Sequence, residues 1–269
     1  MRIVSLNAWG GRQGGALAEW ITKIDADIYC LQEMFSAPLL SDPFLNDEDG
    51  HRVRLNLFGE FEKLLPQHNG YFCAGSKGYV NDSQWTGLDV EYGLAVFVRR
   101  SLPVVAQQSD MVHGRFRCDS TGSPPLSRSG HVFRCRLADG HVTVGNIHGL
   151  WDPAGKHDTP ERKAQARAFG SLIDSVAKPG DGIVACGDFN LLPNSATFAE
   201  MGRTEWRNLI SEFEISSTRN SLYKKENRFA DYALANSALN VTSFEVPQEP
   251  LISDHCPLIM NVQVNGGDA

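Results

Sequence analysis

The chain has 269 residues, 42% of them hydrophobic, and a formal net charge of −7 at pH 7. This composition supplies enough apolar side chains for a packed core and excludes an intrinsically disordered chain. The acidic balance argues against a protein that coats nucleic acid through its phosphate backbone, but it does not exclude a nuclease, because a single cleft can carry its own local charge.

No apolar window reaches the length of a transmembrane helix, and the apolar run after Met1 is too short for the core of a signal peptide. The six cysteines form no Cys-x-x-Cys pair, and Cys30 and Cys186 lie in apolar runs, which predicts reduced core thiols. No linker or repeat divides the chain. We therefore expect one domain over residues 1–269 in a cytoplasmic monomer, without membrane insertion or an evident protein partner.

The first half of the chain alternates between strand and helix patterns. Apolar spacing predicts strands at 2–6, 28–31, 71–74 and 93–98, and helices at 16–25 and 57–65. Residues 36–54 contain Pro38, Pro43 and a cluster of acids, which predicts a long loop. The glycine-rich stretch at 10–15 lacks the lysine and hydroxyl residue of a phosphate-binding loop.

The second half continues the mixture, which indicates an α/β protein. The pattern predicts strands at 115–117, 131–137, 142–148, 183–186, 228–234, 241–246 and 258–262, helices at 158–177, 194–201 and 205–211, and a loop at 119–129. Residues 149–156 are one residue too long for a Walker A loop, and His157 stands where that motif requires serine or threonine.

Polar residues follow or close many of the predicted buried strands. They are Asn7, Glu33, His148, Asp188, Asn190, Asp231, Asp254 and His255. Taken singly, each has an ordinary interpretation: the residues after Gly187 suit a turn, and a lone glutamate is usually solvated. Taken as a set, they predict an active site, because layered α/β folds gather functional residues from several strand ends.

Four short motifs follow one another along the chain: Leu31-Gln32-Glu33, Asn146-Ile147-His148, Gly187-Asp188-Phe189-Asn190 and Ser253-Asp254-His255. With Asn7 after the first strand and Asp231-Tyr232 before the last motif, the chain resembles the endonuclease/exonuclease/phosphatase family over nearly its whole length. The resemblance implies a DNase I-like, four-layer α/β sandwich, in which two mixed sheets pack face to face with helices outside and the site lies at one edge.

The resemblance also implies a phosphate-ester hydrolase with Mg²⁺ or Mn²⁺ as cofactor. Glu33 is then the principal metal ligand, Asn7 lies near it, and Asp254 joins them directly or through water. Oxygen ligands of this kind suit Mg²⁺, which keeps several of its waters.

The remaining motif residues are implied to act on the reacting phosphate. Asp188 and Asn190 position the nucleophilic water, His148 donates to a phosphate oxygen, and Asp231 orients His255. A metal, an imidazole and an amide all stabilise the charge of a phosphodiester transition state. Whether Asp188 or His255 takes the proton from water stays open at this stage.

The substrate is the least determined part of the prediction. We expect a phosphodiesterase with nuclease-like chemistry and nucleic acid among its candidate substrates, and we name Tyr92, Trp151 and Arg219 as residues that reach the substrate. The alternatives are a phosphatase of a small or lipid-derived phosphate, such as an inositol phosphate, and a non-catalytic binding protein on the same fold. Ser253-Asp254-His255 is not a serine-hydrolase triad, because neighbours in a strand point to opposite faces.

Overall fold

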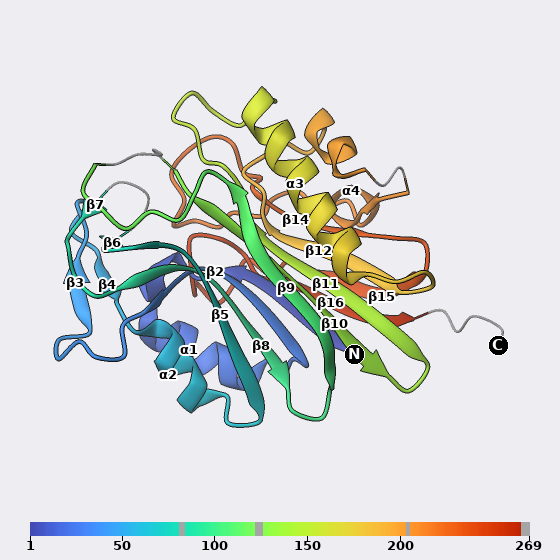
Figure 1. Cartoon of the computed structure of the whole chain (residues 1–269), viewed down its shortest axis with the longest axis horizontal. Helices are drawn as coiled ribbons and strands as arrows, with labels where there is room; N and C mark the ends of the chain where they lie inside the picture. The colour runs from blue at the N-terminus through green and yellow to red at the C-terminus, as the bar shows by residue number, and fades with distance from the viewer. Residues whose placement is uncertain (81–83, 122–125, 203–204, 265–269) are drawn as a thin grey trace.

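A computed structural model describes residues 1–80, 84–121, 126–202 and 205–264 (Figure 1). Its two large sheets pack face to face, and helices cover both outer faces, as predicted. The first sheet consists, in spatial order, of β15 (Leu239–Glu245), β16 (Leu258–Val264), β1 (Arg2–Asn7), β2 (Ile28–Ser36), β8 (Glu91–Arg99) and β5 (His68–Lys77). The second consists of β13 (Arg207–Asn208), β14 (Asp231–Ala235), β12 (Gly182–Asp188), β11 (Gly140–His148), β10 (Arg128–Leu137) and β9 (Val104–His113).

Both sheets are mixed. β1 and β2 run parallel in the first sheet, as β11 and β12 do in the second, and the other neighbouring strands of both sheets pair antiparallel. On the outside, α1 (Gly14–Lys23) and α2 (Leu57–Leu64) pack on the first sheet, and α3 (Pro160–Val176), the 3₁₀ helix η2 (Ala196–Met201) and α4 (Leu209–Glu212) lie on the second (Figure 1). A further 3₁₀ turn, η1 (Trp9–Gly11), follows β1.

Strand periodicity explains the layering. On β1, Ile3 belongs to the core between the sheets, whereas Val4 and Leu6 pack with the helical layer of α1 and α2. Because successive side chains of a strand point to opposite faces, Asn7 returns to the inner side, toward the second sheet. The inner face of the first sheet therefore ends in a polar residue at the edge of the sandwich.

A polar bridge links the two sheets just below that edge. Nε2 of Gln32 on β2 donates to Oδ1 of Asn146 on β11 at 2.7 Å, and Nδ2 of Asn146 donates to the carbonyls of Leu31 and Ala95 at 3.2 and 3.3 Å. All of these groups are buried. A buried hydrogen-bonded pair of this kind fixes how the two sheets meet, because any shift leaves polar atoms unsatisfied.

Two predictions for the first half of the chain were wrong, namely the loop at 36–54 and the strand at 115–117. The loop at 36–54 contains a hairpin of β3 (Phe44–Asn46) and β4 (Arg52–Arg54). The strand predicted at 115–117 is absent, since Arg117 makes only an isolated bridge with Ser76, and β9 pairs with β10 instead. β9 is an edge strand with mostly exposed or half-buried residues, so it lacks the apolar alternation that marks a strand in the sequence.

Three further boundaries differ from the predictions. The helix predicted at 205–211 is the short strand β13 followed by α4, and residues 228–230 precede β14 rather than belong to it. β10 already begins at Arg128, inside the predicted loop at 119–129, of which residues 122–125 lie outside the described part of the chain. A second hairpin joins β6 (Tyr79–Val80) and β7 (Gln84–Trp85).

The cysteines and the helices bear on two further expectations, reduced core thiols and the lack of a membrane span. All six cysteines are free thiols, and five of them are buried. Within the described ranges, no helix combines the length and the apolar character needed to cross a bilayer.

Candidate active site

A cleft of about 710 Å³ lies at one edge of the sandwich, where the motif-bearing strands end. Nine of the eleven predicted site residues line this cleft: Glu33, Tyr92, His148, Trp151, Asp188, Asn190, Arg219, Asp254 and His255. The other two, Asn7 and Asp231, are buried directly behind it and contact its lining through hydrogen bonds. The structure thus brings together residues that are up to 248 positions apart in the chain (7 to 255).

A break in strand β2 directs Glu33 into the cleft. The pairing of β2 with β8 shifts register between Leu31 and Met34, and Glu33 has φ of 52°. A β-bulge re-aims the side chain that it carries, and a positive φ is costly for a residue with a Cβ. The carboxylate that results is 20% exposed, while its neighbours along the strand are buried.

Asn7 joins carboxylates that belong to the two different sheets. Its Nδ2 donates to Oε1 of Glu33 at 2.9 Å and to Oδ2 of Asp188 at 3.1 Å, and its Oδ1 accepts the N–H of Trp9 at 3.0 Å. In this arrangement the amide nitrogen, not the oxygen, faces the carboxylates. Asn7 therefore acts as a bridge here, and it would have to turn its amide over to place oxygen beside Glu33.

Asp188 and Asn190 are fixed by the close approach of β11 and β12. A Cβ on Gly187 would lie 2.0 Å from the carbonyl oxygen of Ile147, so only glycine permits this pairing. Beyond it, Oδ1 of Asp188 accepts the backbone N–H of Asn190 at 2.9 Å, and Asn190 adopts φ of 52°, a conformation that asparagine tolerates well. Both side chains thereby line the cleft.

His255 is held by a buried carboxylate on β14. Its Nδ1 lies 2.8 and 2.9 Å from the two carboxylate oxygens of Asp231, which fixes the ring and leaves Nε2 toward Asp188, 3.6 Å away. Burial and the charge of Arg219 lower the pKa of His255, but the carboxylates of Asp231, Asp254 and Asp188 outweigh them and raise it. The protonated imidazolium is therefore favoured.

Asp188 receives positive charge from several sides. Burial raises the pKa of this carboxyl, but His255, His148, Arg219 and Lys156 outweigh burial and lower the pKa below its usual value. Nε2 of His148 lies 3.8 Å from Oδ2 of Asp188. Asp188 consequently stays ionised and remains a hydrogen-bond acceptor at the floor of the cleft.

Asp254 forms a buried ion pair with one oxygen only. Nη1 of Arg219 donates to Oδ2 of Asp254 at 2.5 Å, whereas Oδ1 of Asp254 and Nε of Arg219 are buried without a hydrogen-bond partner within the described chain. Oδ1 of Asp254 also lies 3.8 Å from Nε2 of His255. A buried carboxylate oxygen with no donor marks a position that a cation or a ligand group would satisfy.

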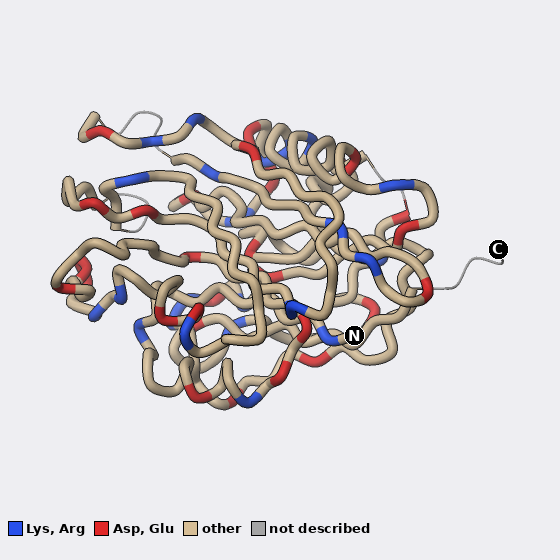
Figure 2. Tube along the Cα trace, turned by 60° about the horizontal axis from the view of Figure 1, so that its bottom comes forward, with Lys and Arg blue, Asp and Glu red and all other residues tan. Residues whose placement is uncertain are grey.

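Residues of both charge signs line the cleft. The acids include Glu33, Glu48 and Asp49, and the bases are Arg12, Arg219, Lys224 and Lys225. Over the described part of the trace, lysines and arginines are interspersed with acids rather than gathered on one face (Figure 2). The positive charge available to a phosphate is therefore local to this cleft.

The donor sets in and around the cleft differ in how well they fit a metal ion. In the predicted set, Glu33 and Asp254 supply carboxylate oxygens of the type that Mg²⁺ and Mn²⁺ prefer, whereas Asn7 turns its amide nitrogen toward Glu33. Asp188, Asp231 and His255 form a second group, with candidate ligand atoms within 4.8 Å of one another.

A third group, Asp47, Asp49 and His51, lies on the acidic loop. Asp47 already binds the guanidinium of Arg12 and the backbone N–H groups of Asp49 and His51, so its oxygens are occupied. This third group is thus a loop-stabilising cluster.

Eight residues outside the predicted set also line the cleft: Trp9, Arg12, Glu48, Asp49, Leu222, Tyr223, Lys224 and Lys225. Arg12 donates to Asp47 at 2.6 Å and lies 3.9 Å from Glu33, and Tyr223 has the guanidinium of Arg219 4.3 Å from its ring centre. Lys156, which belongs to the rejected Walker A stretch at 149–156, lines a neighbouring pocket. Loop residues such as these follow no strand end, so the sequence carries no signal that marks them.

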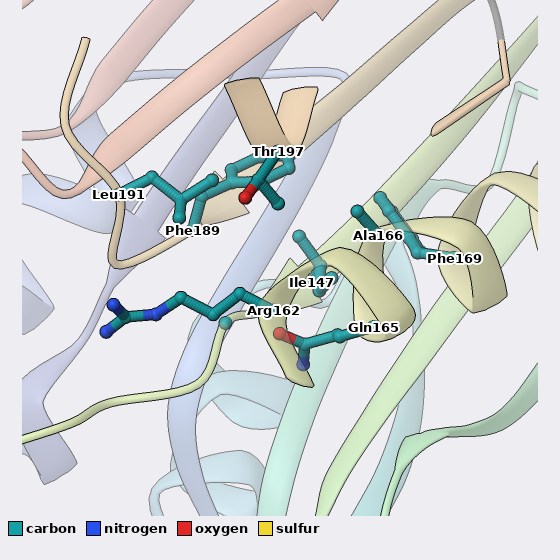
Figure 3. A pocket seen from close by; sticks show the side chains of 9 residues that line it. Ile147, Arg162, Gln165, Ala166, Phe169, Phe189, Leu191 and Thr197 are labelled. Atoms are coloured by element: carbon teal, nitrogen blue, oxygen red, sulfur yellow. The ribbon is translucent and has the colours of Figure 1, made fainter. Parts of the chain in front are cut away.

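Arg162 shapes the loop that follows His148. It stands on the first turn of α3, capped by Thr159, and its side chain extends away from the apolar residues Ala166 and Phe169 (Figure 3). Its guanidinium donates to the carbonyls of Leu150 and Gly155 at 3.1 and 2.8 Å, and also to that of His157. Only 3% of Arg162 is exposed, so its charge is held inside the protein by these carbonyls. The small cavity beside it, about 10 Å³, is too small for a substrate (Figure 3).

Comparison with known proteins agrees with this geometry. A model of the Endonuclease/Exonuclease/phosphatase family matches residues 4–255. Similar solved structures include an endonuclease/exonuclease/phosphatase from Bacteroides vulgatus (17% identity, TM-score 0.67, 98% of both chains) and a mannosyl-6-phosphatase from Bacteroides thetaiotaomicron (16%, 0.68, 98% of this chain and 99% of that one). The human Nocturnin catalytic domain with bound sulfate is also similar (17%, 0.65, 98% and 94%).

At these identities the structural likeness shows the shared fold alone. No curated protein sequence matches the chain. The family model covers nearly the whole sequence, and the motifs that it spans converge in one cleft. The chain belongs to the endonuclease/exonuclease/phosphatase family.

Proposed function

We propose that this protein is a divalent-metal-dependent phosphoesterase that hydrolyses its substrate by direct attack of water, with a phosphodiester as its first candidate substrate. The observation that carries the proposal is the meeting of Asn7, Glu33, Asp188 and His255 at one cleft, from strands of both sheets and from the segment before β16. Family membership supports the same reaction class.

The metal would be held by the carboxylates of Glu33 and Asp254, and Asn7 would add its amide oxygen only after that amide turns over. The unpartnered Oδ1 of Asp254 and the partly exposed carboxylate of Glu33 fit a hard cation such as Mg²⁺ or Mn²⁺. When bound, such an ion supplies positive charge that stabilises the transition state and the departing oxygen.

The chain's own residues would orient the water and bind the phosphate. Ionised Asp188 accepts a hydrogen bond from the attacking water, and the amide of Asn190 lies beside it. His255, kept charged by Asp231, donates from Nε2 to a phosphate oxygen, and Arg219 adds a second cation on the same side. Donors that are already fixed in place stabilise developing charge without reorganisation. The opposite pKa directions of Asp188 and His255 favour Asp188 as the acceptor and His255 as the donor.

A phosphatase of a small phosphate ester is the second candidate. The bacterial relative described as a mannosyl-6-phosphatase supports it, as does the absence of a basic face along the described trace (Figure 2). A nucleic acid held by its phosphate backbone would need clustered lysines and arginines, which neutralise the phosphates and release their counterions into solution. A non-catalytic binding protein is disfavoured, because such a protein has no need for a buried His255–Asp231 pair aimed at Asp188.

The test is hydrolysis of a small substrate panel in Mg²⁺, in Mn²⁺ and in EDTA. The panel contains bis-p-nitrophenyl phosphate, p-nitrophenyl phosphate, single-stranded DNA, abasic duplex DNA and an inositol phosphate, with Asp188→Asn as the blank and the exposed Asn240→Asp on β15 as the matched control. Metal-dependent diester cleavage that only Asp188→Asn abolishes supports the diesterase, and cleavage of monoesters alone supports the phosphatase. Metal binding at Glu33 without turnover of any substrate would favour the binding protein.

A further inference from the structure

A side pocket of about 270 Å³ opens beside the main cleft. The two share Trp151, Asn190, Tyr223 and Lys225 as lining residues, so they are continuous at the point where the phosphate would bind. The side pocket is completed by residues of the loop after β11 and of the segment at 226–227, chiefly Gly155, Lys156 and Asn227. A ligand with its reacting phosphate beside Asn190 can therefore extend a second group into this space.

Lys156 supplies this pocket with a cation that has spare donors. Its Nζ donates to the carbonyl of Phe229 at 2.5 Å, and it forms no ion pair within 4.0 Å among the residues that the structure describes. An ammonium group has three donors, so the remaining two are available. The pKa of Lys156 is lowered to about 8, mainly by burial and also by the charge of Arg219. The carboxylates of Asp188, Asp231 and Asp254 act in the opposite direction and raise it. An anion in the pocket would stabilise the charged form.

Aromatic rings line the way from the cleft to Lys156. The guanidinium of Arg219 lies 4.3 Å from the ring centre of Tyr223, and Nζ of Lys156 lies 5.9 Å from the same centre. Nζ of Lys225 lies 5.7 Å from the ring centre of Trp151, which is 43% exposed. These rings provide faces on which a sugar or a base can pack, with cations at the ends of the path.

The pocket is also pre-formed and carries few competing charges. Arg162 fixes the loop that carries Trp151 and Lys156 by donating to three carbonyl groups of that loop. The pocket's carboxylates are Asp152, which accepts the N–H of Ala154 at 2.8 Å, and Glu226, which is exposed and therefore screened by solvent. A fixed loop lowers the entropic cost of binding a second group.

We propose that this side pocket binds a second anionic group of the substrate, with Lys156 as its counter-charge and Trp151 and Tyr223 as walls for the ring that connects the two. This inference rests on the proposed function and narrows it. The preferred substrates are phosphate esters in which a sugar-sized unit carries a further phosphate. Lys156 has a structural role as well, since its bond to Phe229 ties together two loops, and the experiment has to separate the two roles.

A pair of chromogenic diesters makes this separation. The p-nitrophenyl ester of thymidine 5′-phosphate and the same ester with an added 3′-phosphate differ only in the second anion. For wild-type protein we expect kcat/KM to be about 10-fold or more higher for the 3′-phosphorylated ester, mainly through KM. In Lys156→Met the ratio between the two esters should fall close to one, and Lys156→Arg should keep part of it. The exposed Lys63→Met on α2 should keep the wild-type ratio.

The outcomes separate failure of the inference from failure of the proposed function. Equal kcat/KM for both esters in wild type, or an unchanged ratio in Lys156→Met, would overturn the inference and leave the phosphoesterase intact. If neither ester nor any panel substrate is hydrolysed, the proposed function fails. The inference is then decided by calorimetric binding of thymidine 3′,5′-bisphosphate and thymidine 5′-phosphate. The inference is supported if wild type binds the bisphosphate more tightly than the monophosphate, and if Lys156→Arg keeps this preference while Lys156→Met loses it. Equal affinities of wild type for the two nucleotides would refute the inference.

Discussion

Nδ2 of Asn7 lies 3.1 Å from Oδ2 of Asp188 and joins the two sheets at the floor of the cleft. The same nitrogen donates to Glu33, so one amide separates two carboxylates that would otherwise repel each other. We expect Asn7→Ala to lower kcat by about 100-fold, because both carboxylates lose their fixed positions. Steady-state kinetics beside the exposed control Asn240→Ala would check this. A kcat within twofold of wild type would show that the bridge is dispensable.

The pair of His255 and Asp231 should behave as one unit. Because Asp231 contacts Nδ1 and the substrate side of the ring is Nε2, removing either residue removes the same charged donor. We expect His255→Ala and Asp231→Ala each to lower kcat by roughly 10²–10⁴-fold, and the double variant to be little worse than either. A double-mutant cycle in kcat measures this coupling. Losses that multiply in full would mean that the two residues act separately.

The ion pair between Arg219 and Asp254 gives a test of the metal-ligand set that does not depend on activity. Arg219→Met leaves a buried carboxylate without its partner, and we expect it to lower the free energy of unfolding by roughly 3 kcal/mol in EDTA. If Asp254 supports the metal, Mg²⁺ should restore more stability in this variant than it adds to wild type. Urea denaturation with and without Mg²⁺ measures both quantities. The control is Arg207→Met, whose pair with Glu212 is about one-third exposed and should matter little.

A buried histidine outside the cleft should make the fold sensitive to acid. Burial lowers the pKa of His131 to about 4, and its Nδ1 has no hydrogen-bond partner within the described chain. The imidazole of His131 therefore binds a proton more weakly in the folded state than in the unfolded chain, where its pKa is about 6.5. The resulting stability is fully present above pH 6.5 and is lost as the pH falls toward 4, by roughly 3 kcal/mol.

Replacing His131 should remove its contribution to the acid sensitivity of the fold. In His131→Gln, the free energy of unfolding should fall less between pH 6.5 and 4 than it does in wild type. Urea denaturation at a series of pH values measures the difference between the two proteins, which cancels the contribution of all other titrating groups. Parallel curves for the two proteins would contradict a neutral, buried His131.

The sequence allowed the sandwich and most of the site to be predicted because both follow from strands. Buried strands are continuous apolar runs, and residues such as Asp188 and Asn190 stand directly after them, so position along the chain predicts position at the sheet edge. The resemblance then supplied the order in which the strand ends meet. Asp231 and His255 could be paired only in this way, since their contact spans 24 residues and no local pattern marks it.

The parts that could not be predicted depend on tertiary contacts. The positive φ of Glu33 arises from a bulge against β8, which the apolar sequence of β2 does not reveal. Strand β9 is polar because it lies at an edge, and its pattern therefore resembles that of a loop. Tyr223 and Arg12 reach the cleft, and Lys156 reaches the side pocket, from loops where neither helical nor strand periodicity applies. Their side-chain positions depend on distant partners, such as Asp47 for Arg12 and the carbonyl of Phe229 for Lys156.

The measurement that tests the central claim most directly is the rate of diester hydrolysis as a function of Mg²⁺ concentration, for wild type and Glu33→Gln. We predict no turnover of wild type in EDTA and a saturable rise with Mg²⁺. In Glu33→Gln the midpoint should move to at least about 10-fold higher Mg²⁺, because a neutral amide replaces the main anionic ligand while the fold, checked by its melting temperature, stays unchanged. Undiminished wild-type turnover in EDTA, or the same Mg²⁺ midpoint in both proteins, would contradict a metal-dependent reaction centred on Glu33.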